Sequence, residues 1–234
     1  MLSIIIPTLN EEKYLPHLLS SIKKQKIRQD YEIIVADGGS EDKTVKIAKN
    51  FGCKIVDGGK SPAEGRNNGA EIAKGDLLLF LDADTLLPRD FFAKTFQEFK
   101  RRNLDVAGFC LKPRSNRKIH KIFYEVFYNW IILLFEKFLA HASQAILVKK
   151  EIFERIGGFD KEIKFAEDHS FARKAKKIGK FGILRQVWVF SSIRRFEKEG
   201  WVPLYLKYVF AEIYMILFGD IKRDIFRYKF GNFK

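Results

Sequence analysis

The stretch that decides the fold is DLLLFLDADT, residues 76–85. Its five apolar residues, 77–81, are too few for a typical helix and are typical of a strand buried on both faces of a sheet. Asp82 and Asp84 follow, and alternate residues of an extended chain point to the same side. The two carboxylates would therefore repel each other unless a cation or strong donors neutralised them. The stretch predicts a metal–diphosphate site at the end of a central strand; an acidic turn that caps the next helix is the alternative.

The residues before this stretch alternate between apolar strands and helices with short connections. Strands are expected at 2–6, 31–36 and 53–56, and helices from the turn after Pro7 to about 24, at 42–50 and at 61–74. Thr8 and Asn10 are candidate caps for the first helix. The repeated strand–helix unit predicts an α/β fold, in which a mostly parallel central sheet carries helices on both faces.

The ends of these strands collect polar residues. In open parallel sheets, ligands bind just beyond the carboxyl ends of the strands. The residues at those ends are Thr8, Asn10, Glu11, Asp37, Asp82 and Asp84. The chain has neither GxGxxG after its first strand nor GxxxxGK[ST], which argues against a dinucleotide-dependent oxidoreductase and a P-loop enzyme. We therefore expect a metal and Arg or Lys side chains to meet the phosphates.

The second half is less regular and more apolar. Strands are expected at 105–111, 143–148 and 181–190, the last as one strand or two, and helices at 88–102, 150–156 and 168–178. Two further helices, 118–139 and 201–218, have wide apolar faces with Trp, Tyr, Lys and Arg near their margins, and a basic, aromatic tail begins at Gly219. This pattern is typical of helices that lie in a membrane interface. The alternative is that the two helices pack on each other or form a homodimer interface.

Composition and charge narrow the class of protein. Apolar residues make up 47% and charged residues 31% of the 234, as in globular proteins, and 43 Lys and Arg against 29 Asp and Glu give a net charge of +14. Such a charge favours anionic partners, namely phosphates, anionic lipid or nucleic acid. Cys53 and Cys110 lack metal-ligand spacing and are expected as small core residues in a reducing compartment. No signal peptide and no simple membrane span is expected.

Five segments occur in order: PTLNEE (7–12), ADGGSEDKT (36–44), GRNNGA (65–70), LDADT (81–85) and GGFD with AEDHSFARKAKKIG (157–160 and 166–179). Together they resemble the inverting nucleotide-sugar glycosyltransferases of family 2, which have the GT-A fold. The resemblance covers about residues 1–195. It implies a GT-A transferase domain at 1–195, followed at 196–234 by helices that contact a membrane or form a dimer.

The resemblance also implies roles for individual residues. Asp168 would be the catalytic base, and Asp84 would hold Mg²⁺ or Mn²⁺ on the diphosphate. The remaining residues would contact the donor: Thr8 and Glu11 in the nucleoside pocket, Asp37 at the base, Arg66 at the base or diphosphate, and Asp82 at the ribose. Other readings of these residues are turn caps for Asp37, a helix start for Glu167 and Asp168, and a solvated helix face for Arg66.

One motif of the family's processive synthases, Gln-x-x-Arg-Trp, is missing, and Arg194-Arg195-Phe196 stands in its approximate place. We therefore expect one sugar to be moved per encounter, with Arg194 and Arg195 closing over the diphosphate. The donor would be a UDP or GDP sugar, and His169 would border the acceptor.

The acceptor would be a polyprenyl phosphate or another lipid-linked saccharide. The enzyme would then be cytoplasmic, peripheral on the inner face of the cell membrane, with no nucleic-acid partner. A nucleotidylyltransferase, and a non-catalytic basic module that binds anionic membrane or nucleic acid, are the alternatives.

Overall fold

The structure, a computed structural model, describes residues 1–226. The end of the expected basic tail, residues 227–234, lies outside the described residues. The first half contains β1 (Leu2–Thr8), α1 (Leu15–Lys23), β2 (Tyr31–Asp37), α2 (Thr44–Asn50), β3 (Lys54–Asp57), α3 (Pro62–Glu71), β4 (Leu77–Leu81) and α4 (Phe91–Arg101). The second half contains β5 (Val106–Pro113), α5 (Lys118–Tyr124), η1 (Glu125–Trp130), α6 (Ile131–Leu134), β6 (Ala145–Lys149), α7 (Lys150–Ile156), α8 (Glu167–Ile178), β7 (Phe181–Ser191), α9 (Arg194–Glu199) and α10 (Trp201–Phe218).

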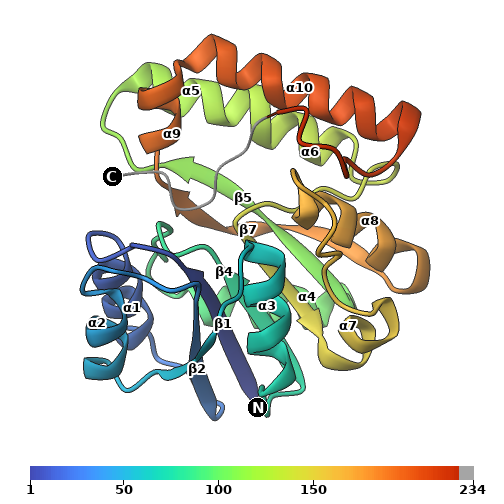
Figure 1. Cartoon of the computed structure of the whole chain (residues 1–234). Helices are drawn as coiled ribbons and strands as arrows, with labels where there is room; N and C mark the ends of the chain where they lie inside the picture. Colours follow the sequence, from blue (N-terminus) through green and yellow to red (C-terminus); the bar gives the residue numbers. More distant parts are fainter. Residues whose placement is uncertain (227–234) are drawn as a thin grey trace.

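The strands form one seven-stranded sheet in the order β3-β2-β1-β4-β6-β5-β7 (Figure 1). Only β6 runs against its neighbours, pairing antiparallel with both β4 and β5. The other pairs are parallel, so the expected mostly parallel sheet is confirmed. Helices cover both of its faces: α1, α2 and α4 contribute to one apolar cluster, and α3, α7 and α8 to the other.

The central strands are buried on both faces, as the run 77–81 predicts. Along β4, Leu79 and Leu81 belong to one apolar cluster, whereas Leu78 and Phe80 belong to the other. All four side chains are at most 1% exposed. Each side chain of this size contributes roughly 1.5–3 kcal/mol when fully buried. The strand thus joins the two halves of the core and fixes where its acidic end emerges.

Packing accounts for two residues of the segment GRNNGA, Gly69 and Asn67. A Cβ on Gly69 would lie 2.5 Å from Cγ2 of Ile5, so only glycine lets α3 approach β1 this closely. Asn67 exchanges hydrogen bonds with the backbone of Phe159, N–H to Oδ1 and Nδ2 to carbonyl, each at 2.8 Å. These contacts fix α3 on the sheet and leave Arg66 facing the strand ends.

The first helix begins later than expected, at Leu15, and neither Thr8 nor Asn10 caps it. Asn10 has a positive φ of 57°, its backbone N–H donates to Ser40 Oγ, and its Oδ1 accepts from the Glu41 N–H. Thr8 is the last residue of β1. Bonds to the turn after β2 therefore hold residues 9–14 out of a helix.

The expected helix 118–139 is broken into α5, the π-helical turn η1, and α6, which ends at Leu134. Asn129 lies in η1 and is buried, where its amide group bonds both the N–H and the carbonyl of Leu111. Beyond α6, Glu136 is also buried and pairs with Arg102 and Arg185. Asn129 thus faces inward at the π-helical turn, where the helix is locally widened.

Candidate active site

The acidic end of β4 forms a tight turn. The N–H of Asp82 donates to the Gln144 carbonyl at 2.9 Å and so extends the pairing with the segment before β6. The N–H and hydroxyl of Thr85 both bond to the Asp82 carbonyl, at 3.1 and 2.7 Å. Thr85 therefore closes the LDADT turn and places both carboxylates beyond the end of the sheet.

Arg66 of α3 bridges Asp82 to the start of α8. Its Nη2 donates to Asp82 Oδ1 at 2.8 Å and its Nη1 to Glu167 Oε1 at 2.6 Å. The guanidinium is 4% exposed and lies 5.2 Å from the centre of the Phe159 ring. A charged group this deeply buried is retained because it is paired. Arg66 thus lies between Asp82 of the predicted donor site and Glu167 beside the predicted base, not on a solvated helix face.

A second arginine, Arg194 at the start of α9, holds two other acids. Its two terminal nitrogens donate to the two carboxylate oxygens of Glu11 at 2.9 and 2.6 Å, and its Nε lies 3.1 Å from Asp84 Oδ2. The guanidinium also lies 4.6 Å from the centre of the Tyr14 ring. Bidentate pairing of this kind is the geometry in which arginine binds carboxylates and phosphates. Arg194 therefore has the groups and the position to exchange a carboxylate for a phosphate.

Burial dominates the electrostatics of these acids. It raises the pKa of Glu11 to about 7, against the opposing effect of Arg194, and it also raises the pKa of Asp84. Asp82 raises the pKa of Asp84 further, because both groups are anions. Buried carboxylates that resist ionisation next to one another form a site that a divalent cation would stabilise.

Asp168, the predicted base, is the second residue of α8. Burial raises its pKa to about 6, while the positive charge of His169 acts in the opposite direction. Its Oδ1 accepts a 2.9 Å hydrogen bond from the His169 N–H. A carboxylate whose pKa lies near 6 is ionised at neutral pH yet basic enough to take a proton.

Asp37 and Thr8 form a separate part of the site at the end of β2. Thr8 Oγ1 donates to Asp37 Oδ1 at 2.9 Å, and the Asp37 carboxylate also accepts from the Gly39 N–H and from the N–H and hydroxyl of Ser40. Asp37 therefore orders the turn after β2. Whether it also contacts the donor base stays a prediction.

Not all of the site residues predicted from the sequence lie together in the structure. Glu11, Arg66, Asp82, Asp84, Asp168 and Arg194 are linked by ion pairs or by electrostatic effects on one another. Arg195 points elsewhere, with Nη1 3.4 Å from the Tyr208 hydroxyl, although its charge still lowers the pKa of Asp84. Sequence reasoning assigned no site role to Glu167 and Tyr14. Glu167 is adjacent to the predicted base, which is the signal that could have found it.

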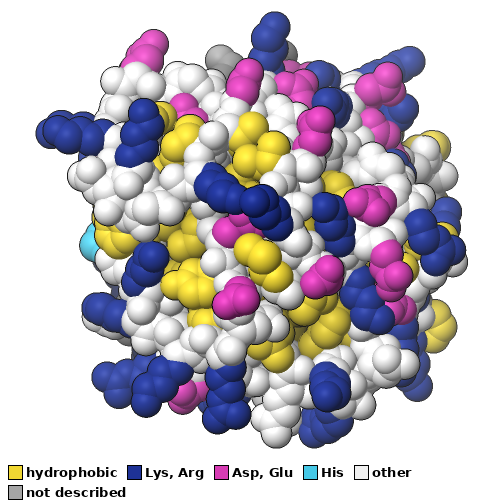
Figure 2. All heavy atoms as spheres, turned by 90° about the horizontal axis from the view of Figure 1, so that it is seen from below, with side chains coloured by type: hydrophobic (Ala, Val, Ile, Leu, Met, Phe, Trp, Pro, Cys, Tyr) yellow, Lys and Arg dark blue, Asp and Glu magenta, His cyan; other side chains and the backbone are white. Residues whose placement is uncertain are grey.

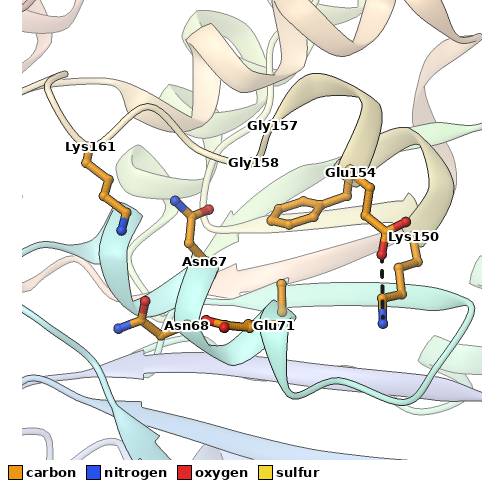
Figure 3. A pocket seen from close by; sticks show the side chains of 10 residues that line it. Asn67, Asn68, Glu71, Lys150, Glu154, Gly157, Gly158 and Lys161 are labelled. Carbon is orange, nitrogen blue, oxygen red and sulfur yellow. Dashed lines mark ion pairs between the residues drawn. The ribbon is translucent and has the colours of Figure 1, made fainter.

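A surface hollow of about 440 Å³ lies between α3 and α7, away from these carboxylates (Figure 3). It is lined by polar residues of α3 and of the segment after β6, among them Asn67, Asn68, Lys150, Glu154 and Lys161. Lys150 and Glu154 lie 4.0 Å apart across one turn of α7. Asn67 is held by its bonds to the backbone of Phe159, and none of the predicted site residues lines the hollow.

Residues 3–159 match the model of the family described as Glycosyl transferase family 2. The chain belongs to this family. It is 32% identical over 182 residues to a PGL/p-HBAD biosynthesis glycosyltransferase of Mycobacterium bovis (strain BCG / Pasteur 1173P2), covering 73% of this chain and 68% of that one. The chain spans only 32–54% of the length of the first three curated relatives that it matches.

Solved structures confirm the GT-A fold. TarS 1–349 of S. aureus in complex with UDP superposes with a TM-score of 0.67 at 22% identity, covering 84% of this chain and 62% of that one. Mannosyltransferase PcManGT from Pyrobaculum calidifontis, in complex with GDP-Man and Mn²⁺, gives 0.66 at 24% identity, covering 79% and 54%. At these identities the likeness shows the fold, while donor, metal and acceptor belong to the proposals below.

Proposed function

We propose that this protein is a metal-dependent inverting glycosyltransferase that moves one sugar per encounter from a UDP or GDP sugar to a lipid-linked acceptor. The observation that carries the proposal is the set of buried and half-buried acids at the carboxyl end of the sheet. Asp82 and Asp84 lie there beside two arginines that bind carboxylates in the way they would bind phosphates. Asp168 adds a carboxylate with a raised pKa on the neighbouring helix.

The donor set fits a divalent metal. Asp84 and Asp82 offer only carboxylate oxygens, which suit Mg²⁺ or Mn²⁺, and the raised pKa of Asp84 reflects a burial that a cation would offset. Asp84, assisted by Asp82, would hold this cation, and when bound it would neutralise charge on the departing nucleoside diphosphate. The relative PcManGT, described in complex with Mn²⁺, supports the proposal.

The protein's own groups would then carry the transfer. Arg66 and Arg194 would give up a carboxylate contact and pair with the diphosphate. Asp168 would take the proton from the acceptor hydroxyl, whose oxygen bonds to the anomeric carbon as the bond to the diphosphate oxygen breaks. One displacement inverts that carbon. If the acceptor arrives as a phosphate oxyanion, it has no proton to lose, and Asp168 would only orient it.

The second half of the chain supports a membrane-bound acceptor. In Figure 1, α10 lies alongside α5 and α6, beyond the carboxyl ends of the strands. Phe123 of α5 contacts Trp201 and Tyr205 of α10, yet many apolar side chains of α5, η1, α6 and α10 face outward. Those at least 45% exposed are Ile119, Ile122, Val126, Phe127, Trp130, Leu134, Val202, Leu206, Phe210, Ile213, Ile216, Leu217 and Phe218. We call this set the apolar surface.

Three polar residues of this region face the opposite way. Asn129 in η1, Glu136 after α6 and Glu212 in α10 are bound to groups of the transferase domain, whereas the apolar surface faces outward. In the sequence, the exposed Lys118 and Lys121 lie in α5, and the exposed Lys222 and Arg223 follow α10. An apolar surface with basic residues at its edge is complementary to a bilayer of anionic lipid, which we propose as its occupant.

Within residues 1–226, α10 is the one helix that is long and apolar enough to cross a membrane, and 17% of it is buried. Glu212, however, lies in its middle and binds Arg173 and two histidines of the transferase domain. A spanning arrangement would break these contacts and carry a carboxylate into lipid. The contacts favour a helix that lies on a membrane surface and does not span it, and we propose that this surface is the inner, cytoplasmic face of the cell membrane.

Thermal stabilisation by nucleoside diphosphates tests the donor site. UDP, GDP, ADP and CDP are each added with and without Mn²⁺ or Mg²⁺, because a ligand that binds only the folded state raises Tm. We expect a metal-dependent rise with UDP or GDP, reduced in Asp84→Asn. No rise with any nucleotide would reject the donor site and favour a non-catalytic basic module.

Against that module, Lys and Arg on the face seen in Figure 2 are spread among Asp and Glu and form no single basic stripe.

A further inference from the structure

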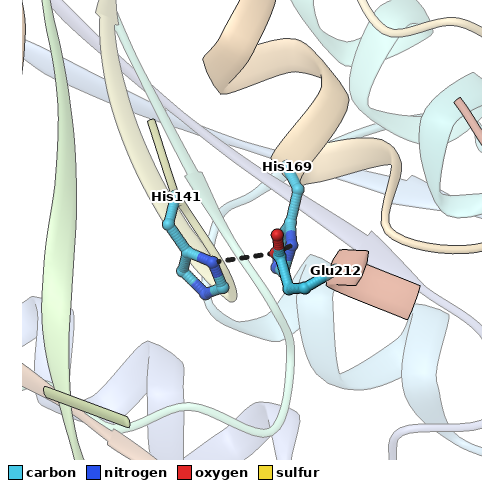
Figure 4. Close-up of side chains that lie close together, drawn as sticks. All are labelled: His141, His169 and Glu212. Atoms are coloured by element: carbon cyan, nitrogen blue, oxygen red, sulfur yellow. Dashed lines mark hydrogen bonds and ion pairs between the residues drawn. The ribbon is translucent and has the colours of Figure 1, made fainter. Parts of the chain in front are cut away.

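Three side chains outside the proposed donor site converge from three separate elements (Figure 4). His141 lies in the segment between α6 and β6, His169 follows Asp168 in α8, and Glu212 lies in α10. Each offers one ligand atom, and these atoms all lie within 4.8 Å of one another. The cluster therefore joins the segment before β6, α8 and α10 at one point.

The distances are close to those of a metal site. Oε1 of Glu212 lies 2.5 Å from His169 Nδ1 and 3.2 Å from His141 Nδ1. In a tetrahedral zinc site with bonds of about 2.0–2.2 Å, neighbouring ligand atoms are about 3.3 Å apart. One of the two spacings already agrees, and the other needs a small outward movement of the His169 ring.

The type of ligand separates this cluster from the donor site. Two imidazoles and one carboxylate are a donor set of zinc sites, whereas Mg²⁺ and Mn²⁺ prefer sites made of oxygens, such as Asp82 and Asp84. His141 Nε2 is also buried without a hydrogen-bond partner, so this nitrogen too is available to a ligand. The side chains of the three residues are 12–26% exposed, so solvent reaches the cluster and water would supply a fourth ligand.

One hydrogen bond and one longer carboxylate contact surround the ligands, in positions that second-sphere groups occupy in protein metal sites. Arg173 Nη2 donates to Glu212 Oε2 at 2.6 Å and leaves Oε1 directed at the histidines. On the far side of the His169 ring, Nε2 lies 3.8 Å from Asp168 Oδ1. A metal-bound imidazole commonly has a carboxylate at its other nitrogen, and Asp168 also offsets the charge that Arg173 brings.

We propose that His141, His169 and Glu212 bind one Zn²⁺ ion, distinct from the cation at Asp84, which fastens α10 to α8. Glu212 and Lys207 are the two charged residues of α10, so this ion would be the main polar attachment of that helix to the transferase domain. Because His169 directly follows Asp168, the ion would hold α10 and its part of the apolar surface close to the proposed base. The proposal needs no assumption about the donor or acceptor.

Metal binding by the full chain tests the proposal. The protein is dialysed against a chelator, and Zn²⁺ is titrated in competition with a chromophoric chelator, while Co²⁺ reports tetrahedral coordination through its visible absorption. We expect one Zn²⁺ per chain, and at least a tenfold loss of affinity in both His141→Gln and Glu212→Gln. His17→Gln, which removes an exposed imidazole from α1, is the matched control and should bind zinc as the wild type does.

Two further measurements keep the outcomes separate. Asp84→Asn should keep its zinc, and Glu212→Gln should keep Mn²⁺-dependent nucleotide binding, so failure of one site does not imply failure of the other. Melting temperatures without metal show whether each variant folds, and His141→Gln replaces Glu212→Gln if the latter does not. Absence of zinc and cobalt binding in the wild type, or equal affinity in all folded variants, would overturn the proposal and leave hydrogen bonds alone to join the helices.

Discussion

The sheet with its covering helices and the helical region α5, η1, α6 and α10 distribute the same kinds of residue in opposite ways. In the sheet region, apolar side chains from both halves of the chain fill the two sides of the sheet, and acids stand at the strand ends. In α5, η1, α6 and α10, many apolar side chains face outward, while Asn129 and Glu212 bind groups of the rest of the chain. The first region is organised around a buried core. The second exposes the apolar surface, for which we propose a bilayer as the occupant, and the proposed donor site lies where the two regions meet.

The largest expected effect concerns the acids at this junction. Asp168→Asn removes the proposed proton acceptor and should lower kcat by roughly 10²–10⁴-fold, and Asp84→Asn should cause a loss of similar size. Release of nucleoside diphosphate from the sugar donor measures both. Asp57→Asn, an exposed acid at the end of β3, is the matched control and should keep its activity.

Turnover within threefold of wild type in both variants would reject the site. A large loss in Asp84→Asn with a small loss in Asp168→Asn would instead indicate that the acceptor arrives as a phosphate oxyanion.

Two isoleucines test the contrast between the sheet region and the outer helices directly. Ile5 in β1 is fully buried, so Ile5→Ala should lower the free energy of unfolding by about 2–5 kcal/mol. Ile216 in α10 is 55% exposed, so Ile216→Ala should change it by no more than about 0.5 kcal/mol. Urea unfolding of both variants provides the comparison. Similar losses would mean that the outer face of α10 is buried in an oligomer, which would break the contrast.

Vesicle binding should depend on the apolar surface. Phe210→Glu and Leu217→Glu each remove an exposed apolar side chain that would contribute roughly 1.5–3 kcal/mol when buried in lipid, so partition onto anionic vesicles should fall at least tenfold. Sedimentation with the vesicles measures it. Ile72→Glu is the control, since Ile72 is 41% exposed but follows α3. Equal binding by all variants, or a stable dimer in light scattering with no vesicle binding, would contradict the assignment.

The smallest expected effect is a shift in pH dependence. Burial raises the pKa of Asp168 to about 6, and a base must be ionised to accept a proton. Activity should therefore fall as pH decreases through about 6, whereas an exposed aspartate would keep it down to about 4. The pH profile of kcat/KM between 5 and 8.5 measures this limb. It should persist in Glu11→Gln, because the raised pKa of Glu11, about 7, would otherwise contribute to it.

Most of the sheet could be predicted because its signals are local. The run 77–81 has apolar side chains on both faces, and the glycine-rich turn after Asp37 marks a strand end, although β1 continues through Pro7 to Thr8. The start of α1 and the π-turn could not be predicted, because they depend on distant partners. Asn10 bonds Ser40 and Glu41, and Asn129 bonds Leu111. The candidate site likewise contains features that local sequence predicts and features that it does not. The carboxylates stand at strand ends, but the pairing of Arg194 with Glu11 joins residues 183 positions apart.

The position of β6 between β4 and β5 has a consequence during synthesis. The strands β3, β2, β1 and β4 can pair as soon as residue 81 has left the ribosome, but the other edge of β4 stays open until residues 145–149 emerge. At roughly 5–20 residues per second this wait lasts on the order of several seconds. During that time LLLFL, the most apolar strand of the sheet, presents unpaired N–H and C=O groups. The nascent chain is therefore most exposed to aggregation at the strand that carries the proposed active site.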